Sequence, residues 1–191
     1  NLTVTITDAP DAGMDASIEF CDNEATTDLF TILNGTPNTG GTWSPALASG
    51  TGVFDPTIDV AGDYTYTVEG IGVCEDATAT VSVIITEAPD AGTDGTIDFC
   101  SDTAPQDLFN ALGGTPDAGG TWSPALTSGN GIFDPTVDAA GTYTYTVTGT
   151  GACPDDTALV TVSITVAPDA GIDGTATFCT NDAPQNLFDS L

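Results

Sequence analysis

Two neighbouring segments alternate hydrophobic and polar residues with the period of a β-strand. Residues 157–166 (TALVTVSITV) place aliphatic side chains on one face and mostly Thr and Ser on the other. Residues 141–147 (GTYTYTV) place Tyr143, Tyr145 and Val147 on a single face. The turn-rich stretch between them, TGTGACPDD, predicts that the two strands form a hairpin.

Shorter segments with the same strand character precede this hairpin. Residues 96–99 (TIDF), 120–123 (GTWS) and 131–134 (GIFD) predict short strands. The segment APQDLFNALGG has Leu108, Phe109 and Leu112 at helical spacing, and it fits either a short helix or an irregular strand. Several short strands separated by turns predict an all-β, immunoglobulin-like antiparallel β-sandwich. Tyr143 fits a tyrosine corner, whose hydroxyl bonds the backbone at the sheet end.

The whole pattern recurs along the chain with a constant period, so that Cys21, Cys100 and Cys179 occupy the same position in successive copies. Residues 10–88 and 89–167 align without a gap at about 50 identical positions, and they predict two complete repeats in a beads-on-a-string array. Residues 1–9 match the final strand of a preceding repeat, and residues 168–191 match the start of a following one. We therefore expect the sequence to be part of a longer secreted protein.

Charge excludes several classes of function. The 191 residues include 28 acids and no Lys, Arg or His, which gives a formal net charge of −28. Phosphate contacts need basic side chains, so nucleic acid is excluded as a direct partner, and an anionic membrane surface is disfavoured. No apolar stretch is long enough to span a membrane. Without His or Lys, no nucleophile has a partnering base, and we expect neither catalysis nor a catalytic residue.

Five cysteines indicate an oxidising compartment. The spacing favours one bridge inside each repeat, Cys21–Cys74 and Cys100–Cys153, with Cys179 pairing outside the sequence. The rival pairing, Cys74–Cys100, would join adjacent repeats.

The repeat resembles a known family. The strings GGTWSPAL (40–47 and 119–126), AGTYTYTV (140–147) and GACPDDTALV (151–160) resemble the immunoglobulin-like tandem repeats of Bacteroidota surface proteins. That family includes gliding-motility adhesins exported by type IX secretion. The resemblance covers the whole sequence and implies a β-sandwich fold, a location at the cell surface and a role in a stalk or adhesin.

Acidic residues recur where one repeat joins the next. Asp90 and Asp94 have counterparts at the equivalent positions of the preceding and the following repeat, and the CPDD turn is expected at the same pole of the sandwich. Clustered carboxylates suit Ca²⁺, so we expect calcium at the inter-repeat junctions, although solvated acidic turns remain the alternative. The candidate ligands are Asp11, Asp15, Asp76, Asp90, Asp94, Asp155, Asp156, Asp169 and Asp173.

Other residues suggest weaker sites. Trp43 and Trp122 are expected to pack in or beside the core, with sugar-binding platforms as the alternative. Thr103, Thr157 and Ser190 follow Asp in a motif that resembles the O-glycosylation sites of Bacteroidota surface proteins.

The sequence thus predicts a non-catalytic structural segment of a long extracellular adhesin stalk or surface filament. Its expected partners are the neighbouring repeats of the same chain. Two alternatives stay open: repeats that bind surface polysaccharide through avidity, or repeats that pack laterally with other copies into a polymer or sheath.

Overall fold

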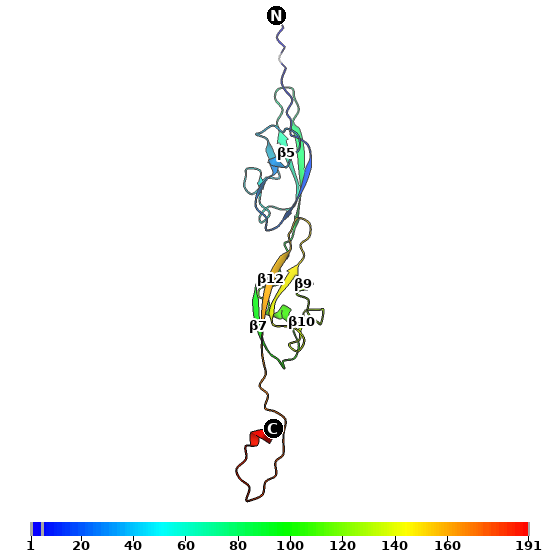
Figure 1. Cartoon of the computed structure of the whole chain (residues 1–191). Helices are drawn as coiled ribbons and strands as arrows, with labels where there is room; N and C mark the ends of the chain where they lie inside the picture. Colours follow the sequence, from blue (N-terminus) through cyan, green and yellow to red (C-terminus); the bar gives the residue numbers. More distant parts are fainter. Residues whose placement is uncertain (1, 5, 191) are drawn as a thin grey trace.

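Two β-sandwiches follow each other along one long axis, and the chain ends lie at opposite ends of the molecule (Figure 1). The structure is a computed structural model that describes residues 2–4 and 6–190, apart from the side chains of residues 189 and 190. The first sandwich consists of β1 (Ala16–Cys21), β2 (Thr27–Asp28), η1 (Leu29–Thr31), β3 (Thr42–Ser44), β4 (Val53–Phe54), β5 (Gly62–Val68) and β6 (Ala77–Thr86). The second consists of β7 (Gly95–Cys100), β8 (Gln106–Asp107), η2 (Leu108–Ala111), β9 (Thr121–Ser123), β10 (Ile132–Phe133), β11 (Gly141–Val147) and β12 (Asp156–Thr165).

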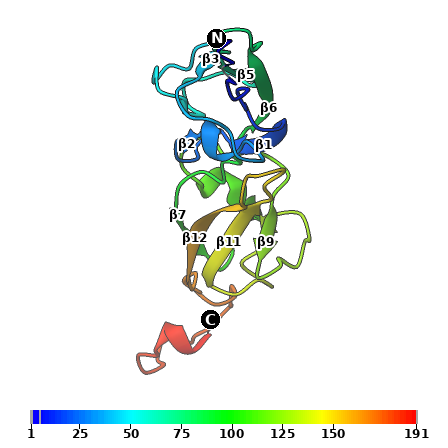
Figure 2. The same ribbon diagram turned by 90° about the horizontal axis from the view of Figure 1, so that it is seen from above.

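Each sandwich pairs a four-stranded sheet with a two-stranded one. The orders are β1-β6-β5-β3 with β2-β4, and β7-β12-β11-β9 with β10-β8. Figure 2 shows β11 between β9 and β12, with β7 beyond β12. The first strand runs parallel to the last one, and all other neighbours are antiparallel. This arrangement is that of an immunoglobulin-like sandwich, so the predicted fold class is confirmed.

The inward faces of the strands form one core in each sandwich. Phe54 and Phe133 are fully buried at equivalent positions. Phe54 stacks on Phe20 at a ring separation of 5.1 Å and meets Tyr64 edge to face at 5.6 Å. The alternating hydrophobic side chains of the strands therefore point into the core, as the sequence pattern predicts.

The predicted hairpin strands are confirmed, and the helical segment is shorter than its pattern suggested. β11 and β12 pair from Gly141↔Val162 to Val147↔Asp156. The segment at 105–113 forms the two-residue strand β8 and a single 3₁₀ turn, η2. Asp107 caps this turn, because its Oδ1 accepts a 3.0 Å hydrogen bond from the N–H of Phe109.

The predicted tyrosine corner is also confirmed. Tyr143 is buried, and its hydroxyl donates a 2.7 Å hydrogen bond to the carbonyl oxygen of Ala139. Tyr64 makes the equivalent 2.8 Å bond to Val60 in the first sandwich. The phenol therefore fastens the loop that enters its own strand.

Outside the two sandwiches the described part of the chain forms no strand. Residues 2–4 and 6–13 precede the first sandwich. Residues 166–186 form no strand either, and the 3₁₀ turn η3 (Leu187–Ser190) follows them. Among the described residues, no helix is long and apolar enough to cross a membrane.

Candidate functional site

A disulfide bond joins the two sandwiches. Cys21 is the last residue of β1, and Cys153 lies in the turn between β11 and β12 of the next repeat. Their sulfurs are bonded, with Cα atoms 4.8 Å apart and a sequence separation of 132. Both residues are buried. The bond therefore crosses the junction between successive repeats.

The predicted pairings Cys21–Cys74 and Cys100–Cys153 are wrong. Cys21 lies opposite Thr86, at the end of β6, whereas Cys74 lies just before β6 begins at Ala77. A strand of 10 residues separates these two levels, and at ~3.3 Å per residue it is about 30 Å long. Cysteines can be bridged only when their Cα atoms are within about 7 Å. The two cysteines of one repeat therefore lie at opposite poles and cannot meet.

The rival pairing between Cys74 and Cys100 is not formed either. Cys74, Cys100 and Cys179 are free thiols in the structure. Cys74 lies half-buried at the outer pole of the first sandwich, and Cys100 lies exposed at the end of β7.

Backbone contacts fasten the linker next to the bridge. The N–H of Asp22 donates to the carbonyl oxygen of Thr86 at 3.0 Å, and the N–H of Ala88 donates to Oδ1 of Asp22 at 3.1 Å. The sulfur of Cys153 lies 3.4 Å from the carbonyl oxygen of Thr86 and 3.5 Å from that of Glu87. A bonded sulfur carries no hydrogen, so these last two are contacts that pack the bridge against the linker.

The acids proposed as calcium ligands are used as hydrogen-bond acceptors for nearby backbone. Asp90 Oδ1 accepts from Gly92 N at 2.7 Å, and Asp94 Oδ1 accepts from Leu159 N at 2.8 Å. Asp11, Asp15, Asp76, Asp155, Asp156 and Asp169 each accept one backbone N–H bond in the same way. Asp173 is exposed in the segment between β12 and η3, which forms no strand.

The predicted gathering of these acids into a multidentate cluster is not found. Among the side chains that the structure describes, in residues 2–4 and 6–188, no group of three or more His, Cys, Asp or Glu is placed to hold a metal ion. The predicted nearness of the CPDD turn to the linker is correct, since Asp156 Oδ2 accepts a 2.8 Å bond from Ala91 N. The sequence analysis did not predict that each of these carboxylates accepts a bond from a different backbone N–H. The acids are therefore spread along the backbone and do not converge on one point.

Two further carboxylates and two phenols have shifted pKa values. The side chain and N–H of Thr57 lower the pKa of Asp55. Burial raises the pKa of Asp138, but hydrogen bonds from Asp134 and Thr127 outweigh that effect and lower it. Burial raises the pKa of Tyr143 above its ordinary 10.0, and the charge of Asp138 raises it further. Burial raises the pKa of Tyr64 as well, with Asp59 adding to the shift.

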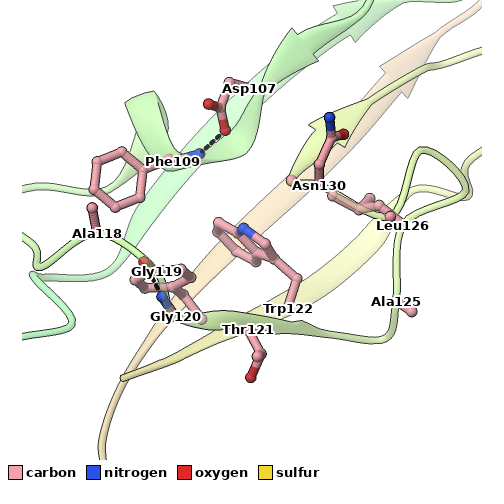
Figure 3. A pocket seen from close by; sticks show the side chains of 13 residues that line it. Asp107, Phe109, Ala118, Gly119, Gly120, Thr121, Trp122, Ala125, Leu126 and Asn130 are labelled. Carbon is pink, nitrogen blue, oxygen red and sulfur yellow. Dashed lines mark hydrogen bonds between the residues drawn. The ribbon is translucent and has the colours of Figure 1, made fainter. Parts of the chain in front are cut away.

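Each tryptophan forms the wall of an open groove. Trp122 is half-buried and packs on Tyr145 with ring centres 5.0 Å apart, and Trp43 packs on Tyr66 at 5.1 Å. Figure 3 shows the indole of Trp122 between Asp107, Gly119 and Leu126. The groove has a volume of about 460 Å³, and its counterpart beside Trp43 about 640 Å³. The indoles therefore support the core with one face and line the groove with the rest.

A glycine is required on the floor of this groove. The hydroxyl of Tyr145 accepts a 2.8 Å bond from Gly120 N and donates a 2.8 Å bond to the carbonyl oxygen of Asp117. A Cβ at Gly120 would meet the ring of Tyr145 at 2.5 Å. The close approach of backbone and phenol thus fixes the shape of the groove.

The candidate glycosylation sites differ in exposure. Thr157 is exposed on β12, whereas Thr103 is half-buried and its Oγ1 accepts a 3.0 Å bond from Cys100 N. The side chain of Ser190 lies outside the described residues. Glycosylation at all three stays a prediction.

The chain matches no protein-family model and no curated protein. It is similar to a variant of a three-domain immunoglobulin fragment of titin, with 13% identity and a TM-score of 0.41 over 80% of this chain and 64% of that one. It is similar to extracellular domains 3–5 of Drosophila OTK, with 14% identity and a TM-score of 0.30 over 83% and 65% of the two chains. Murine CEACAM1b matches at 16% identity and a TM-score of 0.28, over 70% and 72%. This chain spans less than two thirds of the length of the titin and OTK fragments, and its fold assignment rests on its own strand order.

Proposed function

We propose that this chain is a non-catalytic structural segment of a long extracellular adhesin stalk or surface filament. The observation that supports this most strongly is the Cys21–Cys153 bond, because it joins successive repeats instead of closing one. The sandwiches then set the reach, and the bridge resists separation and bending. The end-to-end arrangement and the opposite positions of the chain ends in Figure 1 fit a segment that transmits force along its length.

An extracellular location agrees with the bridge, since disulfides persist in oxidising environments. We propose that the source is a surface protein of the Bacteroidota adhesin type, exported by type IX secretion. The resemblance of GGTWSPAL and AGTYTYTV to those repeats supports this assignment. The absence of Lys, Arg and His from the sequence supports a non-catalytic role, because neither His nor Lys is present to activate a nucleophile.

The experiment is immunogold electron microscopy of intact cells of the organism that makes the protein. Antibodies against this chain should label filaments on the surface. Deleting two complete repeats from the gene should shorten those filaments while leaving the label in place. Label that appears only after lysis, or filaments of unchanged length, would contradict the proposal.

Polysaccharide binding is a second candidate function. The observation that favours it is the recurrence of one aromatic groove in both repeats, with Trp43 and Trp122 at equivalent positions beside Asp28 and Asp107. Indole faces suit the apolar faces of sugar rings, and two weak sites on one chain would act through avidity. A glycan array should show binding by the whole chain that falls steeply in Trp43→Phe and again in Trp43→Phe/Trp122→Phe. Equal binding by the unmodified chain and both variants would exclude the grooves as the polysaccharide-binding sites.

Calcium at the junctions also stays a proposal, now resting on single exposed carboxylates and the net charge of −28. Calcium bound only by the folded state would stabilise it, by about 2.7 kcal/mol at a hundredfold excess over the dissociation constant. Millimolar Ca²⁺ should then raise the melting temperature above that in chelator at matched ionic strength. The rise should vanish in Asp90→Asn/Asp94→Asn, and equal melting temperatures in Ca²⁺ and chelator would rule the proposal out.

A further inference from the structure

The bridge gives the chain a covalent route that avoids most of both sandwiches. Residues 22–152 lie inside the ring closed by Cys21–Cys153. A pull on the two chain ends passes along residues 1–21, across the sulfurs and along residues 153–191. In the folded part this route consists of β1 in the first sandwich and β12 in the second. The remaining strands of both sandwiches lie outside it.

A second route of the same kind lies beside the first. It starts at Cys74, follows β6 through the first sandwich, crosses the linker, and follows β7 to Cys100. Within each sandwich the two routes are hydrogen-bonded neighbours: β1 is parallel to β6, and β12 is parallel to β7. In each four-stranded sheet, one strand of the parallel pair therefore lies on the first route and the other lies on the second.

The two ends of the second route match the two halves of the existing bridge. The sulfur of Cys74 lies 3.8 Å from the carbonyl oxygens of Thr7 and Asp8, just as the sulfur of Cys153 contacts the equivalent carbonyls of the linker. Cys100 lies opposite Thr165 at the end of β12, which repeats the position of the first bridged cysteine at the end of β6. Both poles of the molecule thus present half of the same junction.

We propose that every junction of the repeat array carries this bridge, so that tension runs through two parallel covalent lines and bypasses the rest of each repeat. The inference deepens the proposed stalk function and rests on it for the continuation of the array. Each new bond forms from two thiols, such as Cys74 and the first cysteine of the preceding repeat. The pair loses two electrons and two protons to a disulfide oxidant, which is reduced to two thiols.

This connectivity makes the array almost inextensible. Between two successive bridges, each covalent line contains only a segment such as Cys74 to Cys100. That segment runs from one end of the first sandwich to the far end of the second. Fully extended, that segment spans about 90 Å, and the strands within it are already near that limit at ~3.3 Å per residue. Without the bridges, the two repeats would release about 158 residues, or roughly 540 Å. Residues 101–152 of the second repeat, and their counterparts elsewhere, carry no load.

The first test is single-molecule force spectroscopy of the full chain held by handles at both ends. Under oxidising conditions the contour length should never exceed that of about 60 residues, roughly 210 Å. With reductant, and equally in Cys21→Ser/Cys153→Ser, the ring should open and add about 450 Å in steps that correspond to sandwich unfolding. The control is Cys74→Ser/Cys100→Ser/Cys179→Ser, which keeps the bridge and should behave as the oxidised chain. Full extension of the oxidised chain would overturn the load path.

The second test addresses the array. The native protein is alkylated before unfolding and then mapped without reduction. Cys74 and Cys100 should be found in disulfides with cysteines of the neighbouring repeats. Alkylated Cys74 and Cys100 would overturn the continuous lines while leaving the single bridge intact. Neither result depends on where the protein is located. Failure of the immunogold experiment, which tests the proposed function, can therefore be told apart from failure of this inference.

Discussion

At the scale of single residues, two tyrosines on one strand bond two different loops. On β11, Tyr143 bonds Ala139 in the loop before its strand, and Tyr145 bonds Asp117 and Gly120 near the groove. The first of these bonds could be predicted, because a tyrosine corner depends on a local sequence pattern. The second could not, since it depends on a loop 28 residues away that only the folded sheet brings near.

Removing the hydroxyl of Tyr143 should weaken the second sandwich selectively. Tyr143→Phe leaves the Ala139 carbonyl without its donor, which should cost about 1 kcal/mol of unfolding free energy. In a Trp43→Phe background, the fluorescence of Trp122 during denaturant unfolding reports on the second sandwich alone. Tyr64→Phe in the same background is the matched control and should leave that transition in place. An unchanged midpoint in Tyr143→Phe would contradict the role of the corner.

Alkaline pH should unfold the protein through the same phenols. The folded pKa values of Tyr64 and Tyr143 lie above the ordinary 10.0, so folding favours the neutral form. This contribution to stability is complete below about pH 10 and is lost as the pH rises through the folded pKa. The denaturant midpoint should therefore fall as the pH rises above about 10. Tyr64→Phe/Tyr143→Phe should flatten that fall, and an equally steep fall in this variant would assign the effect to other groups.

At the scale of elements, the parallel pair of strands depends on a carboxylate at its open end. The β7–β12 ladder begins at Gly95↔Val160, and Asp94 accepts the next N–H, that of Leu159. Asp15 does the same for Thr80 in the first sandwich. Alternation of side chains predicted the long strands, and the GIFD segment predicted β10. The two-residue strands β2 and β8 are too short to show a period, and β8 lies in the segment that fitted either a helix or an irregular strand. The partners of the acids were not predictable, because they depend on which strand lies beside which.

Asp94→Ala should therefore loosen the start of the β7–β12 ladder. It removes the acceptor of the Leu159 N–H, and we expect a loss of about 1 kcal/mol, because solvent screening at this exposed site weakens a hydrogen bond to a charged group. Amide hydrogen exchange at Leu159 should accelerate in the same variant. Asp94→Asn keeps an acceptor oxygen and should lie close to the unmodified protein. Equal exchange rates at Leu159 in all three proteins would contradict the claim that Asp94 stabilises the start of the ladder.

At the scale of the whole molecule, repetition made the fold predictable and the cysteine pairing ambiguous. The constant period fixes two cysteines in each repeat, but it fits bridges within a repeat and bridges between repeats equally well. The choice follows from topology, because a parallel first strand ends at the pole opposite the turn that holds the second cysteine. Once the poles are known, only a bridge to the next repeat is short enough.

The bridge between repeats is tested most directly by peptide mapping of the oxidised chain without reduction. Trypsin has no site here because the sequence lacks Lys and Arg, so a protease specific for acidic residues is used. Mass spectrometry should find the peptide that contains Cys21 joined to the peptide that contains Cys153, and reductant should separate them. A Cys21–Cys74 or Cys100–Cys153 peptide pair would contradict the junction described here.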